Sequence, residues 1–227
     1  MNKRLQTIAD MIPAGRGVID VGTDHGYLPV WLAENGYTGR IFASDIHSAP
    51  LASARKTARE AAQEERICFL LCDGLEDCPP EEIDTIVIAG MGGDLICSIL
   101  DRAEFCLDGA YTLILQPMTK AEELRYWLVN NGFRLTAERL VRDGRILYQI
   151  IRARFEENMA LSDAELYSGV FENIRNETLC AEWLDMLIRR FEKEEKGLLS
   201  SAAAEEGRLA ICRGILRELL EMRGDLL

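Results

Sequence analysis

Short apolar runs alternate with helix-forming segments through the first half of this 227-residue chain. Each run ends in a turn that carries glycine or polar residues, and the segments between the runs are rich in helix formers. Parallel strands need long crossover connections, which helices usually supply. The alternation therefore predicts an α/β fold whose mainly parallel sheet has strands at 17–22, 40–45, 67–71, 85–89 and 111–115, with helices at 29–34, 48–63 and from about residue 94.

Two further apolar runs, at 133–141 and 146–152, follow the fifth strand. They are joined at Asp143 and Gly144, and Asp-Gly is a strong signal for a hairpin turn. This pattern predicts an antiparallel hairpin at the edge of the sheet. Between the fifth strand and the hairpin, Thr119 and Glu122 have the spacing of a capping box and predict the start of a helix that ends near residue 131.

Beyond Phe155 the pattern is helical alone, and a second capping box at Ser162 and Glu165 begins it. Two apolar stripes at helical spacing flank a break at 197–207, which predicts two antiparallel helices packed as a hairpin. We therefore expect two domains, at 1–157 and 158–227. The stripes consist of Leu179, Trp183, Met186 and Leu187, and of Leu209, Cys212, Ile215, Leu216 and Leu219.

The composition excludes several classes of protein. The chain has 26 Lys and Arg against 38 Asp and Glu, a net charge of −12, and 48% apolar residues. It is too apolar for a disordered chain and too acidic for a generally basic nucleic-acid binder. No apolar run reaches the ~18 residues of a membrane span, and the N-terminus lacks a signal-peptide core, so we expect a cytoplasmic protein. Seven cysteines without a Cys-x-x-Cys pair, and only two histidines, predict no metal site.

One segment differs in charge from the rest of the chain. Residues 120–154 carry 8 basic and 4 acidic side chains, although the chain as a whole is acidic. Exposed charges more than about 10 Å apart are largely screened at 0.1 M salt, so a local patch of this kind can bind phosphate despite the overall charge. The alternative is that these arginines are solvated side chains on a sheet edge and a helix face.

The residues that end the predicted strands form a coherent set. In an open parallel sheet the ligand binds beyond the carboxyl ends of the strands, so these residues indicate its chemistry. Glycines after the first strand allow the backbone to approach a ligand closely. Asp45 is placed to accept hydrogen bonds from ribose hydroxyls, and Asp73 is placed near an adenine. The strand-end segments are Asp20–Gly26, Asp45–Ile46, Asp73–Gly74, Ala89–Gly93 and Gln116–Met118.

A nicotinamide dinucleotide site would also use a glycine turn and an acid that binds ribose. Its Gly-x-Gly-x-x-Gly pattern places a pyrophosphate on a helix N-terminus. Here Asp24 stands at the middle glycine position, and its carboxylate would repel that anion. S-adenosylmethionine has no phosphate and carries a sulfonium cation, so the acidic turn favours it as the ligand.

Five segments together resemble one family. They are RLQTIADMIP (4–13), DVGTDHGYLP (20–29), DGLE (73–76), IAGMGG (88–93) and LILQPM (113–118). With the helical hairpin that follows, they closely resemble the bacterial TrmK family of tRNA (adenine-22-N1)-methyltransferases over nearly the whole chain.

The resemblance implies a Rossmann-like class I methyltransferase domain with a seven-stranded sheet, and a coiled-coil-like C-terminal domain that helps to hold tRNA. It implies methyl transfer from S-adenosylmethionine to N1 of an adenine, at position 22, in tRNA. We predict that the cofactor contacts Asp20, Gly22, Thr23, Gly26, Asp45, Ile46, Asp73, Gly74, Ala89 and Gly90. We predict that the substrate contacts His25, Tyr27, Met91, Gly92, Gly93, Gln116, Pro117, Arg139 and Arg142.

Asp24 is the predicted catalytic residue. Adenine N1 has a lone pair, so methyl transfer needs alignment and stabilisation of the positive charge that the ring acquires. Asp24 could accept a hydrogen bond, or a proton, from the exocyclic amine; alternatively, it caps the next helix. His25 and Tyr27 could orient Asp24 or stack on the base, or they pack the turn. An adenine in folded tRNA must leave its stack to react.

Three other functions fit parts of the sequence. The first is an S-adenosylmethionine-dependent methyltransferase that acts on a small molecule or a protein, which the acidic composition favours. The second is a nicotinamide-dependent enzyme. The third is a catalytically silent domain whose helical hairpin binds a partner. The leading hypothesis predicts tRNA as the partner, with no membrane, metal ion or protein partner.

Overall fold

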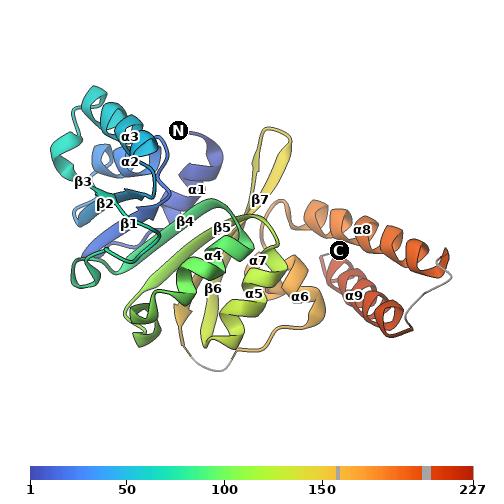
Figure 1. Ribbon diagram of the computed structural model, residues 1–227. Helices are drawn as coiled ribbons and strands as arrows, with labels where there is room; N and C mark the ends of the chain where they lie inside the picture. The colour runs from blue at the N-terminus through green and yellow to red at the C-terminus, as the bar shows by residue number, and fades with distance from the viewer. Residues whose placement is uncertain (157–158, 201–205, 227) are drawn as a thin grey trace.

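The computed structural model describes residues 1–156, 159–200 and 206–226 (Figure 1). Its centre is a seven-stranded sheet with strand order β3-β2-β1-β4-β5-β7-β6, and helices lie on both faces. The strands are β1 (Gly17–Val21), β2 (Arg40–Asp45), β3 (Ile67–Leu71), β4 (Thr85–Gly92), β5 (Thr112–Thr119), β6 (Phe133–Asp143) and β7 (Ile146–Phe155). The helices are α1 (Lys3–Met11), α2 (Tyr27–Glu34), α3 (Ser48–Glu60), α4 (Gly93–Asp101), α5 (Ala121–Asn130), α6 (Asp163–Ser168), α7 (Phe171–Ile174), α8 (Cys180–Ser200) and α9 (Glu206–Gly224).

The sheet is parallel from β3 through β5 and antiparallel at β7 and β6. The predicted parallel strands and the predicted edge hairpin are therefore confirmed. The chain moves outward from β1 to β3 and then returns to place β4 on the other side of β1. This reversal creates a switch point between β1 and β4, and ligands of open α/β sheets bind at the carboxyl ends of strands at such a point.

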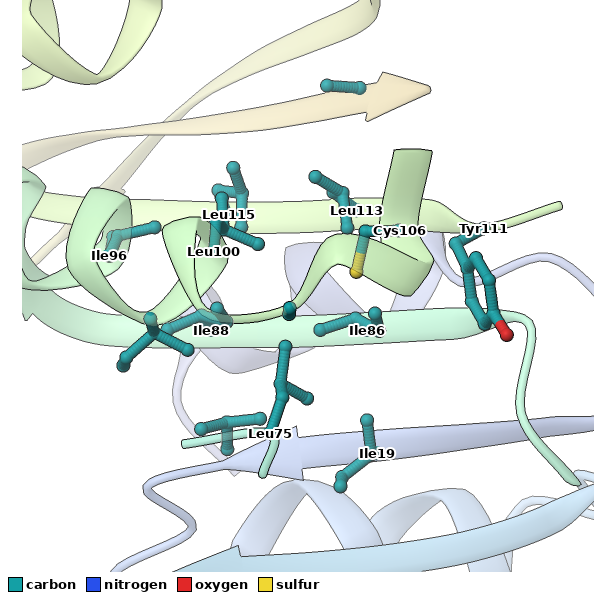
Figure 2. Close-up of a cluster of buried hydrophobic side chains, with 14 of the residues drawn as sticks. Ile19, Leu75, Ile86, Ile88, Ile96, Leu100, Cys106, Tyr111, Leu113 and Leu115 are labelled. Atoms are coloured by element: carbon teal, nitrogen blue, oxygen red, sulfur yellow. The ribbon is translucent and has the colours of Figure 1, made fainter. Parts of the chain in front are cut away.

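Both faces of the sheet are covered, which explains why the strands read as nearly continuous apolar runs. One face packs Ile19, Ile86, Ile88, Leu113 and Leu115 against α4, as Figure 2 shows. The alternate residues of the same strands pack on the opposite face against α1 and α2. That second cluster includes Val18, Ile41, Val87, Ile114 and Ile150.

Helices α8 and α9 form the predicted antiparallel pair. Arg223 pairs with Asp185, and Arg213 pairs with Glu195, so the two helices run in opposite directions. The capping box of Ser162 is present at the start of α6. The stripe prediction was wrong at Met186, which is 41% exposed: the buried face of α8 includes Leu187 of the same stripe but not Met186, because adjacent helical residues point ~100° apart. The buried residues of α8 are Cys180, Leu184, Leu187, Ile188 and Phe191.

The predicted capping box of Thr119 was also wrong. Thr119 pairs with Gly92 as the last residue of β5, so it belongs to the sheet and is not the N-cap of α5. Lys120, with φ of +56°, makes the turn into α5, and no side chain caps the helix. The domain boundary that we expected between 157 and 158 lies outside the described residues. Among the helices that the structure describes, none combines the length and apolarity that crossing a bilayer requires.

A buried ion pair fastens the C-terminal helices to the sheet. Arg125 of α5 donates two hydrogen bonds to the Glu138 carboxylate of β6, at 2.9 and 2.7 Å, and both side chains are almost completely buried. Arg125 also donates to the carbonyl of Leu166 in α6 at 2.9 Å. The Val170 backbone N–H donates to the other Glu138 oxygen at 2.6 Å. One salt bridge thus joins the sheet to the segment from α6 to α7.

Candidate functional site

Two neighbouring cavities form a trench along the carboxyl ends of β2, β1 and β4. The β2-side cavity has a volume of about 340 Å³, and the α1-side cavity has a volume of about 310 Å³. Gly22, Ala89 and Gly90 line both cavities, so the two cavities adjoin each other at the switch point. The β2-side cavity also contains Asp45, Ile46, Asp73, Gly74 and Met91, and the α1-side cavity contains Asn2, Arg4, Asp20, Thr23, Asp24, His25 and Tyr27.

The glycines of the first turn are required by its geometry. Gly22 has φ of +73°, and a Cβ there would lie 2.2 Å from Cε of Met91. Gly26 has φ of +70°, and a Cβ there would lie 2.9 Å from Cβ of Ala54 in α3. The backbone N–H groups of Gly22 and Thr23 both donate to the carbonyl of Ser44, which fixes the turn beside β2. A larger residue at Gly22 would strain the backbone and displace the Met91 side chain.

Asp20 lies buried beneath this turn. The Thr23 hydroxyl donates to its carboxylate at 2.7 Å. Burial raises the pKa of Asp20 to about 6, although the Thr23 hydrogen bond and the Arg4 charge act in the opposite direction. Asp20 therefore ionises within the range in which the protein can be studied.

The pKa of Asp20 predicts a pH-dependent stability. Below its ordinary pKa of 3.8, Asp20 is protonated in both the folded and the unfolded chain, so the full stability is present. As the pH rises through about 6, the free energy of unfolding falls, because the carboxyl group ionises more easily in the unfolded chain. Between pH 4 and pH 7 the free energy of unfolding of the wild type should therefore fall by up to ~3 kcal/mol relative to that of Asp20→Asn. Urea unfolding of both proteins across this range measures the difference. A difference that stays constant with pH would contradict the assigned pKa shift.

Asp24 lies on the open side of the turn. Its φ is +49°, and its side chain is 71% exposed. His25 Nε2 lies 3.6 Å from its carboxylate, and the His25 and Tyr27 rings stack with centroids 5.4 Å apart. The alternative that Asp24 caps the next helix is wrong, because Gly26 is the N-cap of α2 and no side chain caps that helix. The carboxylate is thus presented to the α1-side cavity.

The acids of β2 and β3 line the β2-side cavity. The Asp45 carboxylate accepts a hydrogen bond from the backbone N–H of His47 at 2.8 Å. Asp73 is held differently, because the Arg102 guanidinium donates to both of its oxygens at 2.9 and 3.1 Å. The hydrogen bonds from Arg102 lower the pKa of Asp73. Arg102 therefore keeps Asp73 charged and ties the loop after β3 to the end of α4.

The strand-end residues of β4 and β5 are adjacent. Ala89 pairs with Gln116, and Met91 pairs with Pro117. Gln116 is completely buried and donates to the Pro117 carbonyl at 2.8 Å, so its amide is turned into the protein. A Cβ at Gly93 would lie 2.2 Å from the Lys120 carbonyl. The packing of β4 against the start of α5 therefore requires this glycine, in addition to any role toward a base.

Arg4 is a site residue that the sequence did not indicate. Its guanidinium donates to the Gln116 side-chain oxygen and lies 5.5 Å from the centre of the Tyr148 ring. It lines the α1-side cavity with the carboxylates of Asp20 and Asp24. Arg4 belongs to the first segment of the family resemblance, but that segment alone does not show which residues of the sheet will lie beside it.

The structure does not bring Arg139 and Arg142 into the trench. Arg139 lies 3.5 Å from the Glu177 carboxylate, and Arg142 pairs with Glu182 of α8. Arg125, a third member of the basic segment, is buried against Glu138. Much of the positive charge of residues 120–154 is therefore matched by carboxylates of the structure.

Comparisons with known proteins agree with this geometry. Residues 1–151 match a family model described as a methyltransferase domain. The tRNA (adenine(22)-N(1))-methyltransferase of Bacillus subtilis (strain 168) is 35% identical over 163 residues, which are 72% of this chain and 68% of that protein. The chain belongs to this family, TrmK. The resemblance predicted from the five segments is thus confirmed.

Solved structures of the TrmK family have the same fold over their whole length. The crystal structure of B. subtilis TrmK superposes with a TM-score of 0.79 at 28% identity, covering 100% of this chain and 97% of that one. Sp1610 of Streptococcus pneumoniae, in complex with S-adenosyl-L-methionine, superposes with a TM-score of 0.79 at 28% identity, covering 98% and 99%. The predicted class I methyltransferase fold, with a mainly parallel seven-stranded sheet and C-terminal helices, is confirmed.

Proposed function

We propose that this protein transfers a methyl group from S-adenosylmethionine to N1 of adenine 22 in tRNA. Membership of the TrmK family supports the tRNA substrate over a small molecule or a protein. One juxtaposition of three features carries the chemistry: a turn in which Gly22 and Gly26 have positive φ, Asp45 at the end of the next strand, and Asp24 where a dinucleotide site would need glycine.

The residues of the trench fit S-adenosylmethionine. In this proposal Asp45 accepts hydrogen bonds from the ribose hydroxyls, and the loop at Asp73 and Gly74 contacts the adenine; all three residues line the β2-side cavity. Arg4 and Asp20 supply one cation and one anion for the carboxylate and ammonium groups of the methionine portion. The bound donor supplies an electrophilic methyl group on sulfur. Gly22, which lines both cavities, then lies between the nucleoside and amino-acid ends.

Asp24 acts on the adenine of the substrate. The N1 lone pair forms the new N–CH₃ bond as the S–CH₃ bond breaks, and the positive charge passes from sulfur to the adenine ring. The Asp24 carboxylate accepts a hydrogen bond from the exocyclic amine, whose acidity rises as this charge develops. His25 and Tyr27 orient the carboxylate and provide a flat surface at the mouth of the cavity.

The remaining substrate contacts are part of the same proposal. In this proposal Met91 and Gly92 contact the target base beside the donor, while the buried Gly93 and Pro117 support them from behind and Gln116 acts through Arg4. Arg139 and Arg142 bind phosphate only in competition with Glu177 and Glu182. We also propose that residues 1–157 form the methyltransferase domain, that residues 158–227 assist tRNA binding, and that the enzyme acts in the cytoplasm.

The proposed function is tested with pure protein, labelled S-adenosylmethionine and unmodified tRNA transcripts. Nucleoside mass spectrometry should detect 1-methyladenosine after incubation. Donor binding without 1-methyladenosine in any transcript would contradict the tRNA substrate and favour a small molecule or a protein. Thermal stabilisation by NAD, with none by S-adenosylmethionine, would contradict the methyltransferase chemistry.

Arg4→Met should weaken donor binding. The substitution removes a charge-assisted hydrogen-bond donor from the cavity, and such bonds contribute ~1.5–3 kcal/mol, so the KM for S-adenosylmethionine should rise ~10- to 100-fold. Steady-state kinetics at saturating tRNA measures this effect. Lys3→Met, which alters the exposed neighbour on α1, is the matched control. An unchanged KM in Arg4→Met would limit Arg4 to packing on Tyr148.

A further inference from the structure

A third cavity lies beside the trench and is separate from it. This β5–α8 groove has a volume of about 280 Å³. It is lined by the end of β5, the start of α5, the start of β7 and two residues of α8, and it shares no lining residue with either cavity of the trench. Its lining residues are Pro117, Met118, Thr119, Lys120, Ala121, Glu122, Ile146, Leu147, Tyr148, Gln149, Trp183 and Arg190.

The groove adjoins the trench along the sheet. Gly92 pairs with Thr119, so the last residues of β5 stand beside the turn that is proposed to admit the target base. On the other side, Arg4 lines the α1-side cavity and its guanidinium lies 5.5 Å from the Tyr148 ring of the groove. In the strand order, β5 and β7 come directly after the strands that carry the trench. The groove therefore lies next to the trench, on the side away from β2.

One part of the groove wall is apolar and aromatic, with Met118, Ile146 and Trp183 among its residues. Met118 is 47% exposed and Ile146 is 53% exposed, so two large apolar side chains of the groove face solvent. The Trp183 indole N–H donates to the Ser168 carbonyl at 2.9 Å, and this bond fixes the orientation of the ring. Rigid apolar and aromatic surfaces bind unstacked bases without a strong sequence preference.

The lining also contains two cations, Lys120 and Arg190, and one acid, Glu122; both cationic side chains are about half exposed. Lys120 pairs with Asp94 and Glu123, and Arg190 lies 3.5 Å from Glu122. Exposed ion pairs of this kind contribute ~0–1 kcal/mol, so a phosphate can replace a carboxylate at little cost. The groove is slightly smaller than the ~300–1,000 Å³ of typical ligand sites, which suits a single nucleotide rather than a helical partner.

We propose that the β5–α8 groove binds the nucleotide that directly neighbours the target adenosine in the tRNA strand. Its base packs against Met118, Ile146 and Trp183, and its phosphate lies near Lys120 and Arg190. When the target adenine leaves its stack to reach the trench, its neighbour loses a stacking partner, and the groove provides a replacement. This inference rests on the proposed function and adds a second binding subsite for RNA.

The experiment uses two substitutions that place a negative charge in the groove, Met118→Glu and Ile146→Glu. Both positions are exposed, so the fold should tolerate them. The KM for tRNA should rise about tenfold, while kcat and the KM for S-adenosylmethionine stay within about twofold of wild type. Leu107→Glu is the matched control, because Leu107 is a 42% exposed apolar residue between α4 and β5 that lines neither the groove nor the trench. It should leave all three constants unchanged.

A photo-cross-link locates the nucleotide directly. A tRNA with 4-thiouridine next to the target adenosine should cross-link to peptides containing Met118, Ile146 or Trp183. Cross-links to other elements, or a tRNA KM unchanged in both glutamate variants, would overturn the proposal; a groove that binds a protein partner would give the second result. If the wild type forms no 1-methyladenosine in any tRNA, the proposed function fails first and the groove proposal fails with it.

Discussion

Asp24→Asn should reduce methyl transfer to tRNA at least ~100-fold, the order of effect seen when one preorganised charge-stabilising group is removed from an active site. Asparagine is the suitable replacement because Asp24 has φ of +49°, a conformation that asparagine adopts more readily than alanine. The exposed side chain also makes few contacts that the fold needs. Single-turnover methylation with saturating donor and tRNA measures the effect on the chemical step.

Donor binding should be nearly unchanged in this variant. Calorimetry should give an S-adenosylmethionine Kd within about twofold of wild type, because Asp24 is assigned to the adenine of the substrate. Asp10→Asn, a change at an exposed carboxylate of α1, is the matched control and should be fully active. Normal turnover in Asp24→Asn would remove Asp24 from the mechanism, and a loss of donor affinity equal to the loss of rate would move it to the cofactor site.

Arg125→Met should destabilise the protein by ~3–5 kcal/mol, because it leaves the Glu138 carboxylate buried without its charged partner. Methionine also cannot donate the hydrogen bond that Arg125 makes to the Leu166 carbonyl. The change should therefore loosen the segment from α6 to α7 along with the sheet edge. Urea unfolding followed by circular dichroism measures the loss.

A second substitution separates the buried charge from simple loss of packing. The double variant Arg125→Met with Glu138→Gln should be more stable than Arg125→Met alone, because the uncompensated charge is gone. Arg134→Met removes an exposed pairing with Glu156 and should cost at most ~1 kcal/mol. Equal losses for Arg125→Met and Arg134→Met would show that the buried pair has no special role.

Much of the fold was predictable from local patterns. The five parallel strands, the hairpin at Asp143 and Gly144, and the capping box at Ser162 depend on residues close in sequence, and all are present. The errors arose where a tertiary contact prevailed. Thr119 has the spacing of a helix cap, but pairing with Gly92 draws it into β5. Met186 was assigned to an apolar stripe, but it is exposed, because the buried face of α8 is centred on Leu184, Leu187, Ile188 and Phe191.

The candidate site was predictable to the extent that it lies at strand ends. Asp20, Gly22, Asp45 and Asp73 follow buried runs, and parallel strands bring their carboxyl ends together. Arg4 could not be predicted in this way, because its contact with Gln116 spans 112 residues of sequence.

The basic segment shows a second limit of sequence reasoning. Composition counts charged side chains, but it does not show which ones face solvent. Arg125 contributes to the positive charge of residues 120–154, yet it is buried and neutralised by Glu138. Arg139 and Arg142 lie opposite Glu177 and Glu182, which come from the acidic C-terminal region. Long-range pairing of this kind decides whether a basic segment can bind RNA.

The most direct test of the central claim is the position of the methyl group in tRNA. Wild-type protein, S-adenosylmethionine and a tRNA transcript with adenine at position 22 should give 1-methyladenosine, and nuclease mapping with mass spectrometry should place it at that position alone. A transcript with guanine at position 22 should remain unmethylated. Methylation at another position, or equal methylation of both transcripts, would contradict the account.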